Sequence, residues 1–271
     1  MFCPGCKKLV SKDEQKCPYC GVKKPGAWYK NNIVFTLLRD GDFVIKLIIG
    51  LNIFFYVLSL ILSNGISFSP NPLNFLSPDT RALIFMGASG KVPVDTYKIW
   101  WSFVSASYLH GSILHIIFNM IAFSQLYKMT LNFYGNSRTF LIYSLGGVSG
   151  FVLSYLSGTP VTIGASAAIC GLIGSLFYYG KSRGGLHGTI VYKQVTGWII
   201  SLVIFGLLMP GRIDNFGHLG GFLGGLITGF LFGYLEKKQE SFLSRVFAVF
   251  VALVYSGVLS LSVLNCINII F

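Results

Sequence analysis

The chain has 271 residues, of which 53% are hydrophobic and 11% are charged, and its mean hydropathy is +0.67. Because ordinary globular domains carry about 25% charged residues, this composition excludes a water-soluble domain and indicates a membrane protein. The formal net charge of +12 would suggest a nucleic-acid partner in a soluble protein. Here the basic residues line one membrane face, as described below, so no nucleic-acid partner is expected.

Residues 1–26 are predicted to form a zinc-ribbon-like module in the cytosol. The segment contains two Cys-x-x-Cys pairs, Cys3 with Cys6 and Cys17 with Cys20. Four thiolates brought together by two tight turns suit tetrahedral zinc, and so short a segment cannot bury a sufficient core without a cross-link. Two disulfides are the alternative, but the reducing cytosol favours one structural zinc ion.

Residues 27–42 are predicted to be a juxtamembrane linker. We expect a short interfacial helix in this linker, with Trp28 and Tyr29 at the level of the lipid headgroups. The first long apolar run begins only after Asp42, so no signal peptide is expected.

Seven apolar runs follow the linker, and they predict an all-α polytopic membrane protein. A helix needs about 20 residues to cross a hydrocarbon core of about 30 Å. The fourth and fifth runs have only about 15 residues each, so one end of the fourth should lie within the bilayer, beside protein or a water-filled cavity. The predicted spans are residues 44–63, 103–126, 139–157, 166–180, 195–209, 217–235 and 245–270.

The basic residues predict the orientation of these spans, because cytoplasmic loops are enriched in Lys and Arg. If the N-terminus is cytosolic, only Arg81, Lys91, Lys98 and Arg212 of the 21 basic residues fall on the outer side. We therefore expect a multi-pass integral protein of the lipid bilayer, in the cytoplasmic membrane of a bacterium, with its N-terminus in the cytosol.

Polar side chains gather at the outer ends of three predicted spans. The second span begins with His110, His115 and Asn119, the fourth with Ser166 and the sixth with His218. A single transmembrane serine more often bonds a carbonyl one turn back, and a single histidine is more often a packing residue. Five such residues at one depth favour a functional site, because polar groups within a span are costly.

Small residues would allow the serine and the histidine of two of these spans to meet. Glycines recur every four residues along the sixth span, beginning with Gly221 and Gly225, and leave one helix face without side chains. The fourth span contributes Gly171 at the same spacing, and Gly164 precedes the serine by two residues. Such small-residue faces let two helix backbones approach closely.

Three motifs resemble those of the rhomboid family of intramembrane serine proteases. GASAAICGLIG is similar to the family's Gly-x-Ser motif, HLGGFLGG to its His-x-x-Gly-x-x-x-Gly motif, and HGSILHIIFNM to its His-x-x-x-x-His-x-x-x-Asn second helix. Their order, spacing and helix number agree with the family across a six-helix core, residues 43–236. Residues 237–271 resemble the extra C-terminal transmembrane helix of many members.

The resemblance implies a catalytic dyad without a cofactor. His218 would act as general base, and Ser166 would attack a peptide carbonyl. Asn119, His115 and the backbone N–H of Ser166 would hold the oxyanion. The nearest acid in sequence, Asp214, lies in the loop before the sixth span, so a dyad is expected and not a triad.

The expected substrates are single-pass transmembrane proteins of the same bilayer, cleaved near the outer interface. An extended peptide must enter the site, so the substrate helix has to unwind against its own backbone hydrogen bonds. Gly, Pro or polar residues near its outer end would ease this unwinding, and a small residue such as alanine is expected at the cleavage position.

The chain departs from the family pattern at three positions. Ala167 stands where members usually have glycine, Cys170 where many have an aromatic residue stacked on the histidine, and Ser102 follows Trp101 where members often have Trp-Arg. Two alternatives stay open: a catalytically silent relative that binds and sorts membrane clients, and an unrelated transporter or scaffold. Silent members usually lose the serine or the histidine, and a transporter should show repeated halves, which this sequence lacks.

Overall fold

The computed structural model describes residues 1–271 except 5, 7, 28–40, 66, 210, 239 and 271. The chain forms two compact units, Met1–Lys46 and Leu47–Phe271. The interfacial helix expected around Trp28 and Tyr29 lies outside the described residues.

The first unit contains two similar turns, each with one Cys-x-x-Cys pair. The N–H of Cys3 donates to the carbonyl of Lys8, and the N–H of Cys17 donates to the carbonyl of Val22, both at 2.8 Å. Cys3 and Cys17 are buried together with Val10. Each turn is closed by an isolated antiparallel bridge: Phe2 with Leu9, and Lys16 with Lys23.

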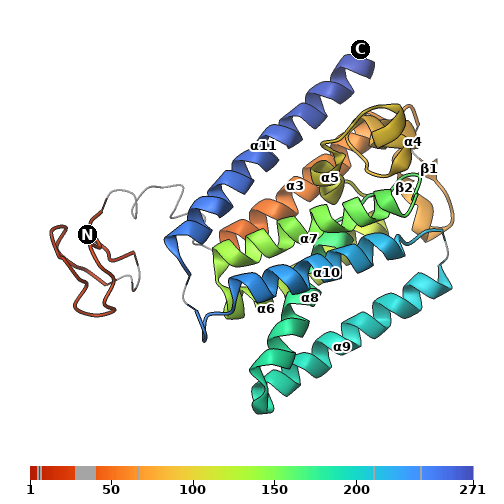
Figure 1. The fold of residues 1–271 in the computed structure, drawn as a ribbon. Coiled ribbons are helices and arrows are strands. Elements are labelled where there is room, and N and C mark those ends of the chain that lie inside the picture. Colours follow the sequence, from red (N-terminus) through yellow and green to blue (C-terminus); the bar gives the residue numbers. More distant parts are fainter. Residues whose placement is uncertain are drawn as a thin grey trace. The chain divides into compact units, whose positions relative to one another are not determined.

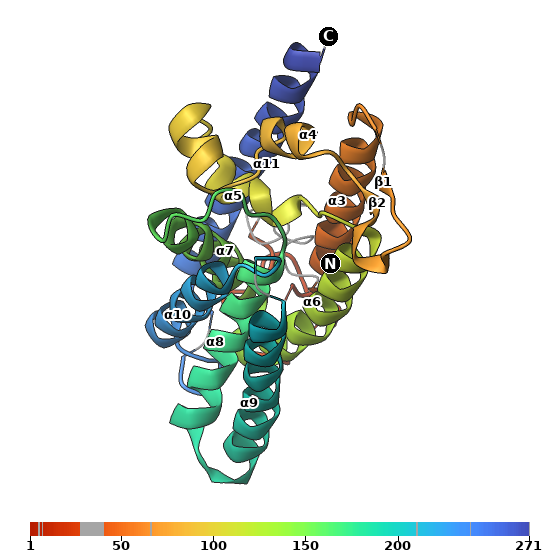
Figure 2. The same cartoon turned by 90° about the vertical axis from the view of Figure 1, so that its right-hand side faces the viewer.

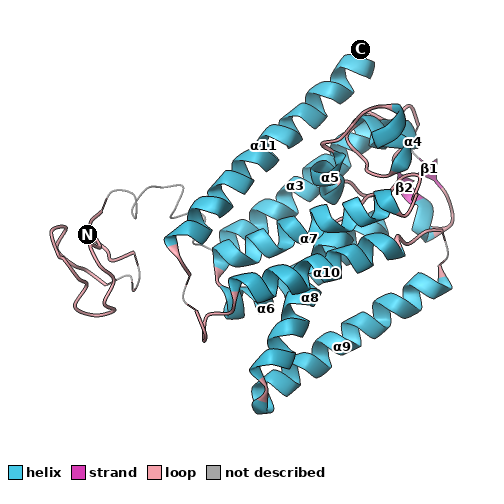
Figure 3. Cartoon of the chain, viewed as in Figure 1, coloured by secondary structure: helices cyan, strands magenta, loops and turns pink. Residues whose placement is uncertain are grey.

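Helices dominate the rest of the chain (Figure 3). By length and composition, four of them are long and apolar enough to cross a membrane, and the bent pair Ser102–Tyr108 with Ile113–Tyr134 is a fifth candidate. The predicted all-α polytopic fold is confirmed. The long helices of the described residues, shown in Figure 1, are α3 (Gly41–Ile61), α6 (Ile113–Tyr134), α7 (Asn136–Leu156), α8 (Ser166–Arg183), α9 (Gly185–Leu208), α10 (Asn215–Phe232) and α11 (Phe242–Ile270).

Helix α8 lies among the other helices of the second unit (Figure 2). It packs against α6, α7, α9 and α10, and Leu172 and Leu176 on its length are fully buried. Its 18 residues correspond to about 27 Å, slightly less than a hydrocarbon core of about 30 Å. Helix α9 differs, because most of its large apolar side chains, among them Leu207 and Leu208, are exposed. Such side chains are suited to contact lipid.

Two expectations about helix length are wrong. The second span, predicted as one run over 103–126, is broken: its two parts meet at 96° between Tyr108 and Ile113. Gly111 and Ser112 lie at this break, and the Ser112 side chain caps α6. The fifth span was expected to be short, yet α9 has 24 residues because the helix continues through the polar stretch before its apolar run.

Backbone contacts join α7, α8 and α10. A Cβ atom on Gly221 would stand 2.0 Å from the carbonyl oxygen of Ala167, and one on Gly225 would stand 1.8 Å from that of Gly171. A Cβ atom on Gly146 of α7 would stand 2.7 Å from the Cα of Gly171. Only glycine permits this approach, so the three helices are held in close register.

Short elements connect α3 to α6. Strands β1 (Ser67–Phe68) and β2 (Phe75–Ser77) pair in an antiparallel hairpin. Helix α11 contacts this connection through Asn265, whose side chain donates to the carbonyl of Phe85 at 2.9 Å. Further along, the connection pairs by backbone with the segment before α8, at Ser89 and Thr162. The elements are β1 (Ser67–Phe68), η1 (Pro72–Asn74), β2 (Phe75–Ser77), α4 (Thr80–Phe85), η2 (Val92–Thr96), α5 (Ser102–Ser105) and η3 (Ala106–Tyr108).

Candidate active site and metal cluster

Ser166 is the first residue of α8, and the backbone before it is tightly held. The N–H of Gly164 donates to the carbonyl of Ala106 at 2.9 Å, and Thr162 exchanges two backbone hydrogen bonds with Ser89. Gly164 has a φ of +123°, which side-chain-bearing residues rarely adopt. Ala165, the N-cap residue of α8, makes no side-chain capping bond. Ser166 therefore lies at a helix N-terminus whose backbone N–H groups receive no hydrogen bond from the N-cap side chain.

His115 lies beside this segment with a defined orientation. Its Nδ1 accepts a hydrogen bond from the N–H of Gly111 at 3.3 Å, so a neutral imidazole carries its proton on Nε2. A Cβ atom placed on Gly164 would stand 2.8 Å from that Nε2 and 3.7 Å from the Oγ of Ser166. The Nε2–H of His115 and the hydroxyl of Ser166 thus lie next to the same glycine.

His110 supports the ring of His115. The two imidazoles meet edge to face with their centroids 5.0 Å apart. His110 is fully buried, and neither of its ring nitrogens has a hydrogen-bond partner among the described residues. It therefore contributes packing to the site.

Asn119 lies one turn along α6 from His115, on the same helix face. Its amide nitrogen donates to the carbonyl of His115 at 2.8 Å, and the side chain is largely buried. The amide group has a second N–H in addition to the one that makes this bond. The arrangement provides two neutral donor groups, an imidazole and an amide, from one helix face.

His218 lies in the first turn of α10. Its backbone N–H donates to the carbonyl of Asp214 at 3.0 Å. One turn further along α10, Gly221 meets the backbone of Ala167, the residue after Ser166. Ser166 and His218 thus lie at the ends of two helices whose backbones are in contact. No hydrogen bond joins their side chains among the described residues, and catalytic hydrogen bonds often tighten only when substrate binds.

Asp214 makes a contribution that the sequence did not reveal. Its carboxylate caps α10 by accepting from the N–H of Gly217 at 2.8 Å, and it also accepts hydrogen bonds from the hydroxyls of Ser154 and Thr162. The position of Asp214, directly before an apolar helix, is a typical N-cap signal. The two hydroxyl partners carry no such signal, because they come from distant parts of the chain.

The three departures from the family pattern are all buried. The methyl group of Ala167 packs against Gly150 of α7. A Cβ atom added to Gly150 would stand 2.7 Å from this methyl group. Cys170 faces Gly221, one turn below His218 on α10. Ser102, whose position members often fill with arginine, has no exposed surface in this chain.

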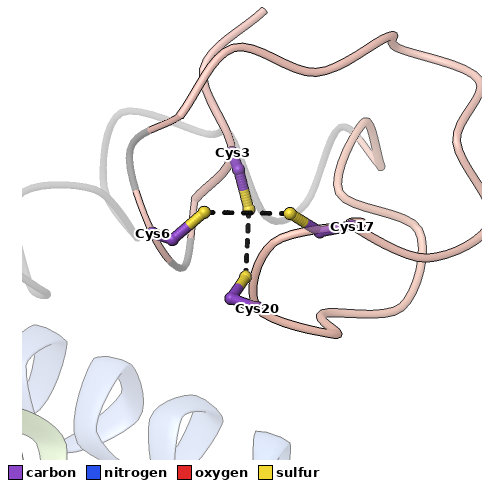
Figure 4. Close-up of side chains that lie close together, drawn as sticks. All are labelled: Cys3, Cys6, Cys17 and Cys20. Atoms are coloured by element: carbon purple, nitrogen blue, oxygen red, sulfur yellow. Dashed lines mark hydrogen bonds between the residues drawn. The ribbon is translucent and has the colours of Figure 1, made fainter.

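The four N-terminal cysteines form a cluster (Figure 4). Their sulfur atoms all lie within 4.8 Å of one another, and none of the four forms a disulfide. The Sγ atoms of Cys3 and Cys20 are 3.6 Å apart, and those of Cys6 and Cys17 are 3.7 Å apart. A tetrahedron with Zn–S bonds of about 2.3 Å has edges of about 3.8 Å. The cluster therefore fits a metal ion bound by four thiolates.

Comparison with known proteins agrees with the three motifs. The Rhomboid domain model matches residues 97–235. The chain is 30% identical to Rhomboid protease GluP of Bacillus subtilis (strain 168) over 149 residues, 55% of this chain and 29% of that protein. It is 32% identical to RHOMBOID-like protein 4 of Arabidopsis thaliana over 154 residues, 56% of this chain and 38% of that protein.

A third relative, Rhomboid-like protease 3 of Toxoplasma gondii, is 26% identical over 181 residues, 63% of this chain and 62% of that protein. The chain thus covers less than two thirds of the length of each of these relatives. The family match nevertheless covers more than half of the chain and includes all three motifs. This chain is therefore a multi-pass integral membrane protein that belongs to the rhomboid family.

Proposed function

We propose that the chain is an intramembrane serine endopeptidase with Ser166 as nucleophile and His218 as general base. The observation that supports this most is the backbone contact between Gly221 and Ala167, which holds the ends of α8 and α10 together beside His115. Two relatives, GluP and Rhomboid-like protease 3, are named as proteases. The chain also keeps both the serine and the histidine.

In this mechanism His218 accepts the hydroxyl proton as the Oγ of Ser166 attacks the peptide carbonyl. The imidazolium then gives that proton to the leaving amine, and an acyl-enzyme forms. Water enters, His218 removes its proton, and hydrolysis of the ester restores the serine. No metal or cofactor is required for these steps.

The oxyanion would be held by neutral donors. Hydrogen bonding at Nδ1 leaves the Nε2–H of His115 directed toward the Gly164 segment, and Asn119 adds an amide from the same helix face. The N–H of Ser166 lies at the positive end of the α8 dipole, which favours negative charge. Preorganised donors of this kind usually supply the largest part of the rate acceleration.

A fluorophosphonate probe tests the nucleophile directly. Purified wild-type protein in detergent should be labelled on Ser166, and Ser166→Ala should not. Ser201→Ala, which removes an exposed hydroxyl on α9, should be labelled like the wild type. The protease mechanism is wrong if Ser166→Ala is labelled like the wild type, or if the wild type is neither labelled nor able to cleave. A catalytically silent protein that binds membrane clients would then be the better interpretation.

The substrates would be transmembrane segments of single-pass proteins, cut near the outer interface. This follows from the cytosolic N-terminus inferred from the basic residues, which places the N-terminus of α8 in the outer half of the bilayer. We expect mass spectrometry to map the cut in a model substrate after a small residue. Replacing helix-breaking residues near the cut by leucine should slow cleavage, because the substrate helix then resists unwinding. Leucine substitutions at the inner end of the same helix serve as the control.

We further propose that Cys3, Cys6, Cys17 and Cys20 bind one structural zinc ion. The four sulfur atoms have the spacing of a tetrahedral thiolate site, and the apolar cluster around them is small: its buried members are Cys3, Val10 and Cys17. Bound zinc would cross-link the two turns and supply the folding free energy that so small a core lacks.

A further inference from the structure

One carboxylate joins three segments next to the proposed dyad. The Oδ1 of Asp214 accepts a hydrogen bond from the N–H of Gly217 at 2.8 Å. Its Oδ2 accepts two more, from the hydroxyl of Thr162 at 2.7 Å and from the hydroxyl of Ser154. Ser154 is fully buried and Thr162 nearly so, which favours a lasting interaction because buried polar groups keep their hydrogen-bond partners.

The three segments include both parts of the proposed active site. Thr162 precedes Ser166 by four residues, in the segment that positions the serine. Asp214 precedes His218 by four residues and is bonded to it through the backbone. Ser154 lies in the last turn of α7 and provides a fixed point in the core. The carboxylate therefore links the serine segment and the histidine helix to the same rigid element.

The bonds of Asp214 differ from those of a triad acid. A triad carboxylate accepts a hydrogen bond from the histidine ring and so orients it. Here both carboxylate oxygens are occupied by other donors, and no hydrogen bond joins Asp214 to the imidazole of His218 among the described residues. A dyad without an orienting acid depends on the relative placement of its two helices.

We propose that Asp214 is a positioning residue, which fixes the serine segment against the histidine helix through its bonds to Thr162 and Ser154. This inference rests on the proposed dyad. Without the carboxylate, the segment before α8 is held to α10 less firmly, and the Ser166 hydroxyl spends less time within reach of His218. A displacement of about 1 Å at a reacting group can cost about 10²-fold in rate.

The partner hydroxyls separate this role from that of a triad acid. We call the hydrogen bonds from Thr162 and Ser154 to the carboxylate of Asp214 the clasp. Thr162→Val removes one bond of the clasp and leaves the carboxylate in place, whereas Thr162→Ser keeps the hydroxyl. If Asp214 acts on the histidine, both variants should behave like the wild type. If it acts through the clasp, the valine variant should be slow and the serine variant should recover most of the rate.

The experiment measures two quantities per folded molecule: the rate of fluorophosphonate labelling of Ser166, and kcat and KM for a model single-pass substrate. We expect Asp214→Ala to lower labelling and kcat about 10²-fold with little change in KM. Thr162→Val and Asp214→Asn should each lower them about 10-fold, a weaker displacement of the same kind. Combining Asp214→Ala with Thr162→Val should cost no more than Asp214→Ala alone, because the two changes break one network.

Thr159→Val is the matched control, since the Thr159 hydroxyl lies in the same segment and, among the described residues, bonds only the hydroxyl of Ser157. It should label at the wild-type rate. A Thr162→Val protein that labels as fast as the wild type would overturn the clasp, whatever Asp214→Ala does. A wild type that is neither labelled nor active would overturn the dyad itself and the clasp with it, a result distinguishable from failure of the clasp alone.

Discussion

The two ends of α10 are each fastened to α7 by a charged side chain. At the start of α10, Asp214 accepts a hydrogen bond from Ser154 in the last turn of α7. At its end, the buried Arg138 in the first turn of α7 donates to the carbonyl of Gly233 at 3.0 Å. An acid at a helix N-terminus and a base at a helix C-terminus both suit the helix dipole.

The hydrogen bonds of Asp214 and those of Arg138 fix different segments of the chain. The Asp214 end also binds Thr162 and so includes the segment that carries the serine. The Arg138 end reaches the carbonyl of Lys238 at 2.6 Å, and Glu240 accepts the N–H of Arg138 in return, so it fixes only the turn that leads to α11. Similar chemistry should therefore control catalysis at one end and stability at the other.

The largest effect should come from His218→Ala at the start of α10. Loss of the general base should lower the cleavage rate by about 10⁴-fold or more, because members of a catalytic unit fail together. Thermal unfolding should stay near that of the wild type, since the imidazole is only partly buried. Cleavage of a model substrate and a melting curve measure the two quantities.

The control is His187→Ala, which removes an exposed imidazole near the other end of α8 that only contacts aromatic rings. It should cleave at the wild-type rate. Full activity in purified His218→Ala would contradict the assignment of the base.

The next largest effect should come from Asn119→Ala. Removal of one oxyanion donor typically costs about 10²–10³ in kcat, less than loss of the base because the remaining donors still act. The fall should appear in kcat and leave KM nearly unchanged, since the interaction strengthens in the transition state. An unchanged kcat would show that the Asn119 amide serves only its bond to the His115 carbonyl.

Much of the fold could be predicted from apolar runs, because a chain in lipid must satisfy its backbone within helices. The run over 139–157 corresponds closely to α7, and α8 begins at Ser166 as predicted. The bend between Tyr108 and Ile113 was missed because the apolar residues on its two sides were taken as one continuous span. Only Gly111 and Ser112 indicated a break there.

The site was less accessible to sequence reasoning. Family motifs name the serine, the histidines and the asparagine, and the family match agrees with those motifs. The clasp has no local signal: Thr162 and Ser154 lie 52 and 60 residues before Asp214, and their hydroxyls look like ordinary loop and helix polar groups. Tertiary structure brings them to one carboxylate: α7 carries Ser154 to the start of α10, and the segment before α8 carries Thr162 there.

At the far end of α10, Arg138→Met should lower stability and spare catalysis. It leaves the carbonyls of Gly233 and Lys238 without their charged donor, and hydrogen bonds to charged groups contribute about 1.5–3 kcal/mol. We expect a lower melting temperature but a cleavage rate per folded molecule within about twofold of the wild type. This loss of rate is smaller than the loss expected when an oxyanion donor is removed.

Arg183→Met provides the comparison, because Arg183 pairs with Glu236 at the surface, where an ion pair contributes little. Its melting temperature should hardly change. If Arg138→Met lost activity without losing stability, the division of labour between the two ends of α10 would be wrong.

The smallest effect on catalysis should come from the cysteine cluster. The anaerobically purified protein should hold one zinc ion per chain, measured by elemental analysis. Cys17→Ser should abolish that binding, because three thiolates hold the ion far less tightly than four. Cys266→Ser, which alters a buried cysteine outside the cluster, should retain the metal.

Chelation should unfold the ribbon and leave cleavage in detergent within about twofold of the wild type, since none of the catalytic steps passes through the metal. The dyad needs only a hydroxyl, an imidazole and neutral donors, all of which the Leu47–Phe271 unit contains. If the purified protein lacked stoichiometric zinc, the proposed zinc site would be wrong. A large loss of cleavage on chelation would show instead that the ribbon takes part in the site, and the separation of structural and catalytic roles between the two units would be wrong.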